Sequence, residues 1–348
     1  MPTDAWNAGS WECISENATC GLGGTEFATI MAARAAARLG HDVHHFGPGI
    51  VREHVDPVFI DGVWWHKNWN RPELYKDSLV WLTCFPHLIP AKEWGAKTTL
   101  LWQHWNDYDY CPTGWQSLID VHGVATRTHE RHCREAGNLH EQRFIVSPFG
   151  VETAWLSPQP WPMRKHDILY GSSPDRGLHH LLTIFPEIHR LTGANLTISY
   201  EIQRWLDAAS DPNHTSHYRS LEVQQQLGRV RSLNLPVELT GHLSHRAFLN
   251  LLGDTKVLTY PCDPLSYTES FGLVVYEALA SGCRVILTNA DSFVEQYGDT
   301  LDLIDLKKLN WLDLFSAAAI KAMGDNHVTP ATYRRTWDQH VLDVLRDL

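Results

Sequence analysis

Two glutamates, Glu269 and Glu277, stand eight positions apart, with Phe271, Gly272 and three aliphatic residues between them. A glycine lets the backbone approach a ligand closely, and a helix that begins after it directs its first N–H groups and positive dipole end at that ligand. Such a helix start binds anions, of which a diphosphate has a suitable size. The carboxylates then lie roughly 9–12 Å apart along the axis. This separation is too long for an acid–base pair but suits the two ends of a sugar–diphosphate–ribose. Two solvated glutamates on an amphipathic helix are the alternative.

The stretch 269–282 resembles the donor-site signature of retaining glycosyltransferases of the GT-B fold, glycosyltransferase family four (group 1). The match covers the whole run Glu269-Ser-Phe-Gly-Leu-Val-Val-Tyr-Glu277-Ala-Leu-Ala-Ser-Gly282, which is more specific than the spacing alone. The resemblance implies that Glu269 contacts the donor sugar and acts in catalysis, and that Glu277 contacts the nucleotide ribose. It also implies that the donor is bound around the helix start, by Ser270, Phe271, Gly272, Leu273 and Val274.

A second candidate segment is the loop 171–177, which contains Arg176 and follows a short apolar run. In the family, a Lys or Arg of this loop binds the donor diphosphate, so the resemblance implies a catalytic and donor-binding role for Arg176. The family often has another basic residue near the start of the loop, where this chain has Ser172 and Ser173. We expect Ser173 to bind the donor and Arg176 to be the one firm cation, unless Arg204 contributes.

A glycine-rich loop, Gly21-Leu-Gly23-Gly24-Thr-Glu26, precedes an apolar helical pattern that ends at Gly40. It is not the dinucleotide-binding fingerprint, because the last glycine spacing differs and no strand precedes it. It resembles the family's first-domain loop, which implies that Gly23 and Gly24 let the backbone approach the donor phosphates and the acceptor. A plain helix-start loop is the alternative.

His104 follows an apolar run at 98–102, at the sheet edge where open α/β sheets bind ligands. The family commonly has a histidine there that reaches the donor sugar, which implies a catalytic role for His104. A structural histidine is the alternative in a chain with 21 of them. Asp107 and Asp109 form a D-x-D, the metal–diphosphate motif of the other large glycosyltransferase fold. That motif is frequent by chance, and Arg176 with the helix start already neutralises phosphates, so we expect no metal and no other cofactor.

Short apolar runs alternate with helical spacing, which predicts parallel sheets with helices on their faces. Residues 1–20 offer no buried first strand and read as a polar loop. Helices are expected after Gly24, at 127–136, from 178 to 188, after Gly272 and at 333–345. Strands are expected at 42–46, 79–83, 98–102, 124–126 and 143–146, and then at 168–170, 196–200, 237–240, 257–260 and 284–287.

With 348 residues, the chain suits two domains. The segment 146–152 resembles the family's interdomain turn, with Phe149 in place of Asn, and the proline-rich segment 157–162 reads as a stiff linker. We therefore expect an acceptor-side domain at 1–157, completed by a C-terminal crossing helix at about 331–348. A nucleotide-sugar-binding domain is expected at 163–330. The resemblance implies an α/β GT-B architecture of two Rossmann-like domains that face a cleft.

Composition narrows the class of protein. Hydrophobic residues make up 43% and charged residues 20%, which are globular values, and no run approaches the roughly 20 apolar residues of a membrane span. No secretory signal is visible, and the seven scattered cysteines form no C-x-x-C, which indicates a reduced, cytoplasmic compartment. The net charge of −11 argues against binding to a phosphate backbone.

The resemblance to family-four enzymes implies a retaining glycosyltransferase that uses a nucleotide-diphosphate sugar, and we expect the acceptor to be a glycan or glycolipid headgroup. Twelve of the 15 tryptophans lie within residues 1–161, and aromatic faces suit sugar rings. Residues 1–160 hold 12 Lys+Arg against 18 Asp+Glu, which disfavours a duplex, although tryptophan also stacks on single-stranded bases. Three alternatives stay open: a transferase acting on nucleic acid bases, a sugar-nucleotide epimerase or glycan phosphorylase, and a non-catalytic nucleotide-sugar binder. No oligomeric state is predicted.

Overall fold

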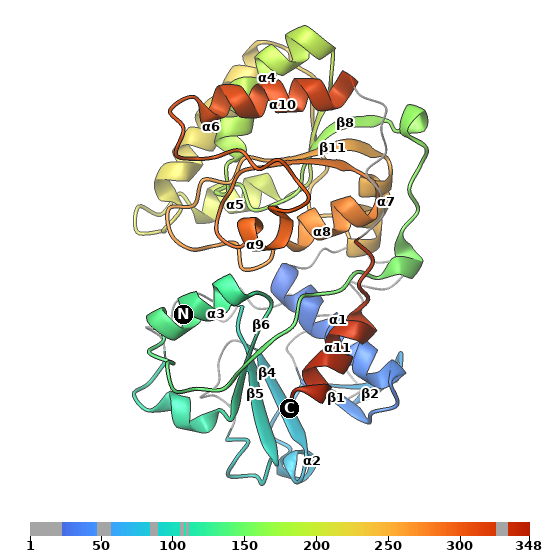
Figure 1. Ribbon diagram of the computed structural model, residues 1–348, viewed down its shortest axis with the longest axis vertical. Helices are drawn as coiled ribbons and strands as arrows, with labels where there is room; N and C mark the ends of the chain where they lie inside the picture. The colour runs from blue at the N-terminus through green and yellow to red at the C-terminus, as the bar shows by residue number, and fades with distance from the viewer. Residues whose placement is uncertain (1–22, 47–56, 84–89, 105–107, 109–110, 325–332) are drawn as a thin grey trace. The chain divides into compact units, whose positions relative to one another are not determined.

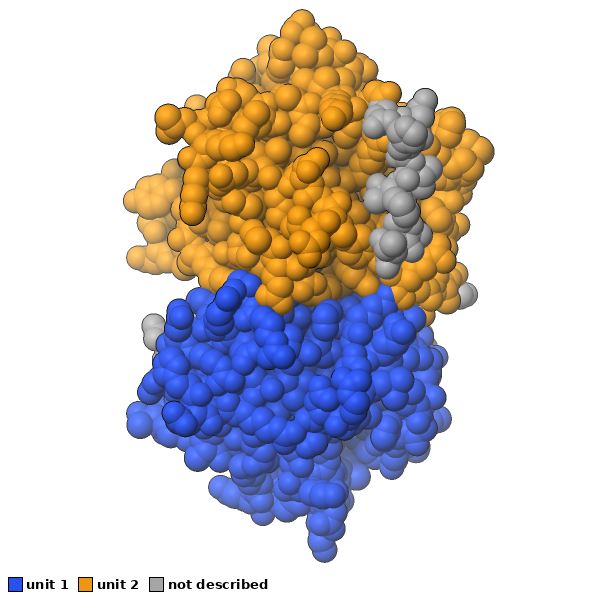
Figure 2. Space-filling view, in the orientation of Figure 1, with its two compact units in different colours: residues 1–151, 335–348 blue, residues 152–334 orange. Residues whose placement is uncertain are grey.

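The computed structural model describes residues 23–46, 57–83, 90–104, 108, 111–324 and 333–348. The expected polar loop at 1–20, Gly21, Asp107 and Asp109 lie outside the described residues. The chain forms two compact units: unit 1 consists of residues 1–151 and 335–348, and unit 2 of residues 152–334 (Figure 2). None of the helices in the described ranges is long and apolar enough to cross a membrane.

The chain passes from unit 1 to unit 2 after Val151, and so earlier than the proline-rich segment that was expected to separate the domains. That segment packs on unit 2 instead. The Gln159 backbone N–H donates to the Gly253 carbonyl over 2.9 Å. A Cβ on Gly253 would lie 2.6 Å from the Ser157 carbonyl oxygen, so only glycine fits beneath the segment. The proline-rich segment 157–162 is therefore part of unit 2 and not a linker between the units.

Unit 2 contains one five-stranded sheet in the order β10-β9-β8-β11-β12, with all neighbouring strands parallel. The strand order reverses between β8 and β11, because the chain first extends the sheet in one direction and then returns to extend it in the other. Helices α4, α6 and α10 cover one face, while α7 and α8 lie on the other (Figure 1). The strands are β8 (His166–Tyr170), β9 (Leu196–Ile198), β10 (Val237–Leu239), β11 (Thr255–Tyr260) and β12 (Arg284–Leu287). The helices are α4 (Leu178–Thr192), α5 (Ile202–Ala208), α6 (His217–Ser232), α7 (His245–Gly253), α8 (Leu273–Ala280), α9 (Phe293–Tyr297) and α10 (Trp311–Gly324).

The core of unit 2 follows from two patterns in the sequence. The central strand β8 ends in three consecutive residues with no exposed surface, Ile168, Leu169 and Tyr170, as expected for a parallel strand covered on both faces. Helix α4 buries a stripe of apolar side chains at helical spacing, which is the face it turns to the sheet. That stripe consists of Leu178, Leu181, Leu182, Phe185 and Ile188.

Unit 1 contains a four-stranded parallel sheet in the order β4-β5-β6-β7 and a separate three-stranded sheet in the order β1-β3-β2. Strand β2 runs antiparallel to β3 through a turn at Asp61 and Gly62, which have φ of 54° and 81°. The strands are β1 (Val43–Phe46), β2 (Val58–Ile60), β3 (Val63–His66), β4 (Leu79–Thr83), β5 (Thr98–Trp102), β6 (Val121–Val124) and β7 (Phe144–Val146). The helices are α1 (Gly24–Arg38), α2 (Pro72–Tyr75), α3 (Arg127–Ala136) and α11 (Trp337–Arg346).

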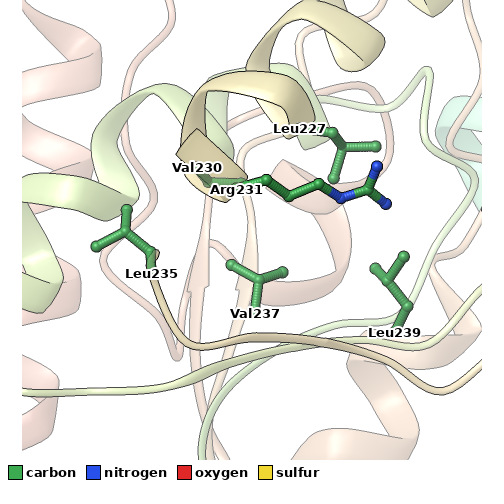
Figure 3. A pocket seen from close by; sticks show the side chains of 6 residues that line it. All are labelled: Leu227, Val230, Arg231, Leu235, Val237 and Leu239. Carbon is green, nitrogen blue, oxygen red and sulfur yellow. The ribbon is translucent and has the colours of Figure 1, made fainter. Parts of the chain in front are cut away.

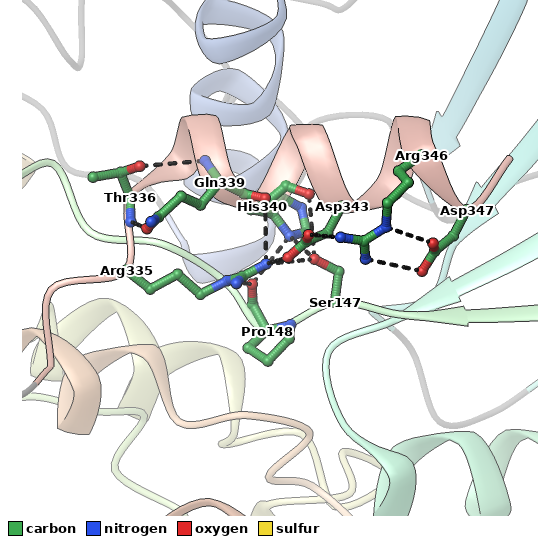
Figure 4. Close-up of polar contacts among 9 residues, drawn as sticks. All are labelled: Ser147, Pro148, Arg335, Thr336, Gln339, His340, Asp343, Arg346 and Asp347. Carbon is green, nitrogen blue, oxygen red and sulfur yellow. Dashed lines mark hydrogen bonds and ion pairs between the residues drawn. The ribbon is translucent and has the colours of Figure 1, made fainter.

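The C-terminal helix α11 belongs to unit 1 and packs against α1. Its first turn is closed by a reciprocal cap between Thr336 and Gln339. On its inner side, His340 Nδ1 lies 2.9 Å from Ser147 Oγ, and Arg335 Nε donates to the Pro148 carbonyl over 3.0 Å (Figure 4). The tail thus forms the expected helix, beginning at Trp337, and is held to the turn that follows β7.

Candidate active site

The candidate site of unit 2 lies where the strand order reverses, at the carboxyl ends of β8 and β11. In open α/β sheets this switch point is where ligands bind. The loops after the two strands touch there: a Cβ on Gly177 would lie 1.9 Å from the Pro261 carbonyl oxygen, and Gly177 has φ of 96°. Glycine is required at this position both by its left-handed conformation and by the close approach. The sequence-predicted Arg176 and Glu269 are carried by these two loops.

Arg176 and Glu269 form an ion pair, with 2.6 Å between Nη1 and Oε1. The Arg176 side chain is 33% exposed, whereas that of Glu269 is 4% exposed. The Tyr260 hydroxyl, at the end of β11, donates to the same Glu269 oxygen over 2.5 Å. Ser172 Oγ lies 2.7 Å from the Tyr260 hydroxyl. The structure therefore brings together two predicted residues and adds two that sequence reasoning did not assign to the site.

The charges of this cluster are set by burial and by the ion pair. Burial raises the pKa of the Glu269 carboxyl, while Arg176 and the hydrogen bond from Tyr260 oppose that shift. Burial, reinforced by Glu269, raises the pKa of Tyr260 well above its ordinary range, so its hydroxyl remains a donor. Burial works against the charge of Arg176, but Glu269 raises its pKa well above the ordinary value. Arg176 thus provides a permanent positive charge at the switch point.

The start of helix α8 lies directly after Glu269. Gly272 is its N-cap with φ of 74°, and a Cβ there would lie 2.5 Å from Phe293 Cε1. The backbone N–H groups of Leu273 and Val274 donate to no residue in the described ranges, as is usual in a first helical turn. A Cβ on Gly171 would lie 3.4 Å from Val274 Cγ2, so the β8 loop starts against this turn. The first turn of α8 can therefore bind an anion, together with Arg176.

The loop before α8 is held in place by Asp291. Its Oδ2 accepts the backbone N–H groups of Thr268 and Glu269 over 2.8 and 2.9 Å. Phe271, with 1% of its surface exposed, is part of the core of unit 2. Its side chain therefore anchors the helix start.

Glu277 lies on the second turn of α8 and is 2% exposed. His245, in the first turn of the neighbouring helix α7, lies 2.6 Å from it, measured from Nε2 to Glu277 Oε1. Sequence reasoning identified Glu277 but not this partner. Ser173 Oγ donates to Asp175 within its own loop, and the expected contact of Ser173 with the donor stays a prediction.

The remaining predicted residues, Gly23, Gly24 and His104, belong to unit 1, and their relation to the residues of unit 2 stays a prediction. Gly23 is the N-cap of α1, and a Cβ on it would lie 2.4 Å from Glu26 Oε2. A Cβ on Gly24 would meet nothing within 4 Å. His104 stacks on Phe149, with ring centroids 5.8 Å apart, and burial lowers its pKa to about 3. The imidazole of His104 is therefore neutral.

A cluster of two histidines and an aspartate lies beside the switch point, and the sequence analysis did not predict it. His179 and His180, in the first turn of α4, meet Asp263 from the loop after β11, with their ligand atoms within 4.8 Å of one another. His180 Nε2 lies 2.7 Å from Asp263 Oδ2, and Arg219 Nη2 donates to the same oxygen over 2.7 Å. Arg219 also contacts His179. Its guanidinium provides the positive charge at this cluster, which disfavours an additional metal ion there.

An apolar hollow at the β10 edge of the sheet is separate from these residues. It lies between α6 and the edge strand β10 and contains one charged side chain, Arg231 (Figure 3). Its lining consists of Leu227, Val230, Arg231, Leu235, Val237 and Leu239. None of the candidate donor-binding residues is among them.

Comparisons with known proteins were consistent with this geometry. Residues 223–304 match the family model described as "Glycosyl transferases group 1". This range includes Glu269, Gly272 and Glu277. Among curated proteins, none matches the sequence. The resemblance to group 1 glycosyltransferases is thereby confirmed over the part of unit 2 that the family model covers.

Solved structures with the same fold include AviGT4, a glycosyltransferase involved in avilamycin A biosynthesis, with 16% identity and a TM-score of 0.62 over 94% of this chain and 89% of that chain. Sucrose-phosphate synthase from Thermosynechococcus elongatus has 14% identity and a TM-score of 0.60, covering 93% and 92% of the two chains. Trehalose-6-phosphate synthase OtsA has 12% identity and a TM-score of 0.60, covering 96% and 97%. These likenesses confirm the expected GT-B fold and, with the family match, support the glycosyltransferase class.

Proposed function

We propose that this protein is a retaining glycosyltransferase that transfers a sugar from a nucleotide-diphosphate sugar to a hydroxyl of a glycan or glycolipid headgroup. The observation that carries the proposal is the meeting of Arg176, Glu269 and the start of α8 at the switch point of unit 2. A cation and free helical N–H groups suit a diphosphate, and a buried carboxylate suits a sugar hydroxyl. These are the parts of one donor molecule.

In the proposed reaction, the bond between the anomeric carbon and the diphosphate oxygen breaks, and a bond from that carbon to the acceptor oxygen forms on the same face. The proton of the acceptor hydroxyl passes to the departing diphosphate, so no protein general base is required. Arg176 and the first turn of α8 stabilise the charge that develops on the leaving group. Glu269 and Glu277 hold the two ends of the donor. His104, as a neutral imidazole, would contact the donor sugar from unit 1.

The acceptor and the compartment are inferred from the sequence. The tryptophans in residues 1–161 and the acidic balance of residues 1–160 favour a carbohydrate acceptor over a nucleic acid. The names of the solved relatives indicate different products, so the acceptor of this protein does not follow from its fold. The scattered cysteines favour a cytoplasmic location. We propose that neither a metal nor another cofactor takes part in transfer.

The proposal is tested first by thermal unfolding in the presence of UDP, GDP, ADP and their glucose conjugates. A ligand that binds only the folded protein raises its stability by RT ln(1 + [L]/Kd). At least one conjugate should raise the melting temperature of the wild type. Arg176→Ala should lose the shift, whereas Arg190→Ala, which removes an exposed ion pair with Glu187, should retain it.

Transfer is then assayed with the labelled donor and four parallel acceptors: water, oligosaccharides, lipid-linked sugars and hydroxymethylated DNA. Labelled oligosaccharide or lipid-linked sugar supports the proposal. Labelling of DNA alone would show that the acceptor is a nucleic acid and not a carbohydrate. An epimerised sugar or a sugar phosphate would identify the other enzymes of this fold. Binding without any turnover would identify a nucleotide-sugar binder.

A further inference from the structure

The two glutamates of the candidate donor site are held in the same way, each through one oxygen. Glu269 Oε1 accepts from both Arg176 and Tyr260. Glu277 Oε1 lies against His245 Nε2. In the part of the chain that the structure describes, no hydrogen bond or ion pair reaches Oε2 of either carboxylate.

These second oxygens are nevertheless not enclosed by protein. Several buried side-chain atoms of the described residues have no partner, including Asp254 Oδ1 and Asp263 Oδ1, but neither Glu269 Oε2 nor Glu277 Oε2 is one of them. Each Oε2 therefore keeps contact with solvent, although Glu269 is 3% and Glu277 2% exposed. Two otherwise buried carboxylates thus present one reachable acceptor atom each.

The partner of Glu269 that stays fixed is Tyr260. Arg176 is partly exposed and holds Glu269 through Nη1, so its guanidinium is able to turn toward an arriving anion. Tyr260 is 2% exposed and is packed edge-on against Tyr170 and Phe293, at centroid distances of 6.0 and 5.5 Å. Its hydroxyl is fixed in turn by Ser172. Tyr260 can therefore hold Glu269 while Arg176 binds phosphate.

The partner of Glu277 is fixed by the start of α7. Ser244 caps this helix by accepting the Ala247 N–H over 3.3 Å. The ring centroid of His245 lies 6.4 Å from that of Trp155 and 6.4 Å from that of Phe248. His245 therefore reaches Glu277 from a capped, packed turn.

We propose that Tyr260 and His245 are positioning residues that act on opposite ends of the donor. Tyr260 immobilises Glu269 so that its Oε2 accepts a hydrogen bond from a hydroxyl of the donor sugar. His245 immobilises Glu277 so that its Oε2 accepts from a hydroxyl of the nucleoside ribose. This inference rests on the proposed function, but it assigns separate parts of donor recognition to two residues that neither the sequence motif nor the comparisons identify.

The two roles predict different patterns of affinity. Tyr260→Phe keeps the ring but lets Glu269 turn, so it should weaken a sugar nucleotide about tenfold while leaving the nucleoside diphosphate unchanged within about twofold. His245→Gln should weaken the sugar nucleotide and the nucleoside diphosphate equally, by about tenfold. A merely structural role of Tyr260 would weaken both ligands in Tyr260→Phe. In His245→Gln, where both affinities are expected to fall, a merely structural role would also lower the melting temperature, whereas the positioning role leaves it unchanged.

The test is calorimetric titration of the full chain with UDP, UDP-glucose, GDP and GDP-glucose. Tyr75→Phe is the matched control, because it removes a buried hydroxyl that donates to the Trp69 carbonyl in unit 1. If Tyr260→Phe does not fold, Ser172→Ala, which frees the Tyr260 hydroxyl, should show the same selective loss in weaker form.

The outcomes separate the two proposals. Wild-type protein that binds none of these four ligands, and neither ADP nor ADP-glucose, would overturn the proposed function and the positioning roles together. Wild-type binding with an unchanged ratio of sugar nucleotide to diphosphate affinity in Tyr260→Phe would overturn the role of Tyr260 alone. Unchanged affinity for both ligands in His245→Gln would overturn the role of His245 alone.

Discussion

The Arg176 guanidinium and the Glu269 carboxylate are joined over 2.6 Å at the switch point of unit 2. In the proposed complex they bind different parts of one donor, the diphosphate and the sugar. The diphosphate therefore competes with Glu269 for the same guanidinium. We expect binding of the phosphates to draw Arg176 away from Glu269 Oε1 while Tyr260 keeps its hydrogen bond to that oxygen, which couples recognition of the diphosphate to that of the sugar.

Glu269→Gln removes this competition. We expect the variant to bind UDP or GDP as tightly as the wild type or a few-fold more tightly, because Arg176 no longer has an internal anion. Transfer should fall by about 10²-fold or more, because the sugar loses its charged acceptor. Calorimetry with the diphosphates and a transfer assay measure the two effects.

The matched control is Asp167→Asn, which also removes a carboxylate from an ion pair of unit 2, with Lys256 at 2.6 Å, but at the start of β8. It should leave affinity and transfer unchanged. A Glu269→Gln protein that binds diphosphate tenfold more weakly than this control would contradict the proposal that diphosphate and Glu269 compete for Arg176.

The pH dependence of transfer should report the burial of Glu269. Burial raises the pKa of this carboxyl, so it protonates, and loses its pairing with Arg176, at a higher pH than an ordinary glutamate. The acid limb of kcat/KM should therefore lie above the usual range of a glutamate. The hydrogen bond from Tyr260 lowers this pKa, so in Tyr260→Phe the limb should move to still higher pH. An acid limb at the same pH in the wild type and in Tyr260→Phe would count against assigning this limb to Glu269.

The same raised pKa has a consequence for stability. The neutral Glu269 carboxyl is favoured in the folded protein, so the stability it contributes is present below the pKa of the unfolded chain and is lost as pH rises through the folded pKa. Glu269→Gln should therefore unfold at a higher temperature than the wild type at pH 8, with a smaller difference at acidic pH. Melting temperatures across pH measure this effect.

Local patterns predicted much of the fold. Strand β5 and helix α3 have the expected bounds, because a buried parallel strand reads as a continuous apolar run and Thr126 caps α3 by accepting the His129 N–H. The sequence analysis did not predict the hairpin of β2 and β3, although Asp61-Gly62 between two apolar runs is a strong turn signal.

The candidate site was predicted only in part, for a physical reason. Arg176, Glu269 and Glu277 lie in motifs that are continuous in the sequence. Tyr260 and His245 act through side-chain hydrogen bonds to residues of other elements, and no local pattern encodes such a contact. The prolines of 157–162 resemble a linker in sequence, but the absence of a side chain on Gly253 lets that segment pack on unit 2.

Transfer should proceed without divalent metal. Arg176 and the start of α8 supply the positive charge that a metal would otherwise bring to the diphosphate. EDTA should therefore change the rate by less than about twofold, which is well below the effect of one lost electrostatic contact in an active site. Dialysed protein assayed with EDTA, Mg²⁺ or Mn²⁺ provides the measurement.

Loss of activity in EDTA and recovery in Mn²⁺ would contradict this prediction. Two variants would then locate the ion. Asp107→Asn tests the D-x-D, and His180→Gln tests the cluster of His179, His180 and Asp263.

The two ends of helix α4 offer a direct test of the contact between the site loops. Gly177 and Gly193 cap this helix with φ of 96° and 71°, so a side chain is strained at either position. A Cβ on Gly193 meets nothing within 4 Å, whereas a Cβ on Gly177 would lie 1.9 Å from the Pro261 carbonyl oxygen. Gly193→Ala should lower the free energy of unfolding by about 1 kcal/mol with full transfer activity. Gly177→Ala should lower it by about 2 kcal/mol more and abolish transfer, because the loop that carries Arg176 must move away from β11. Urea unfolding of both variants measures the difference, and equal losses with equal activity would show that the close contact of the two loops does not position Arg176.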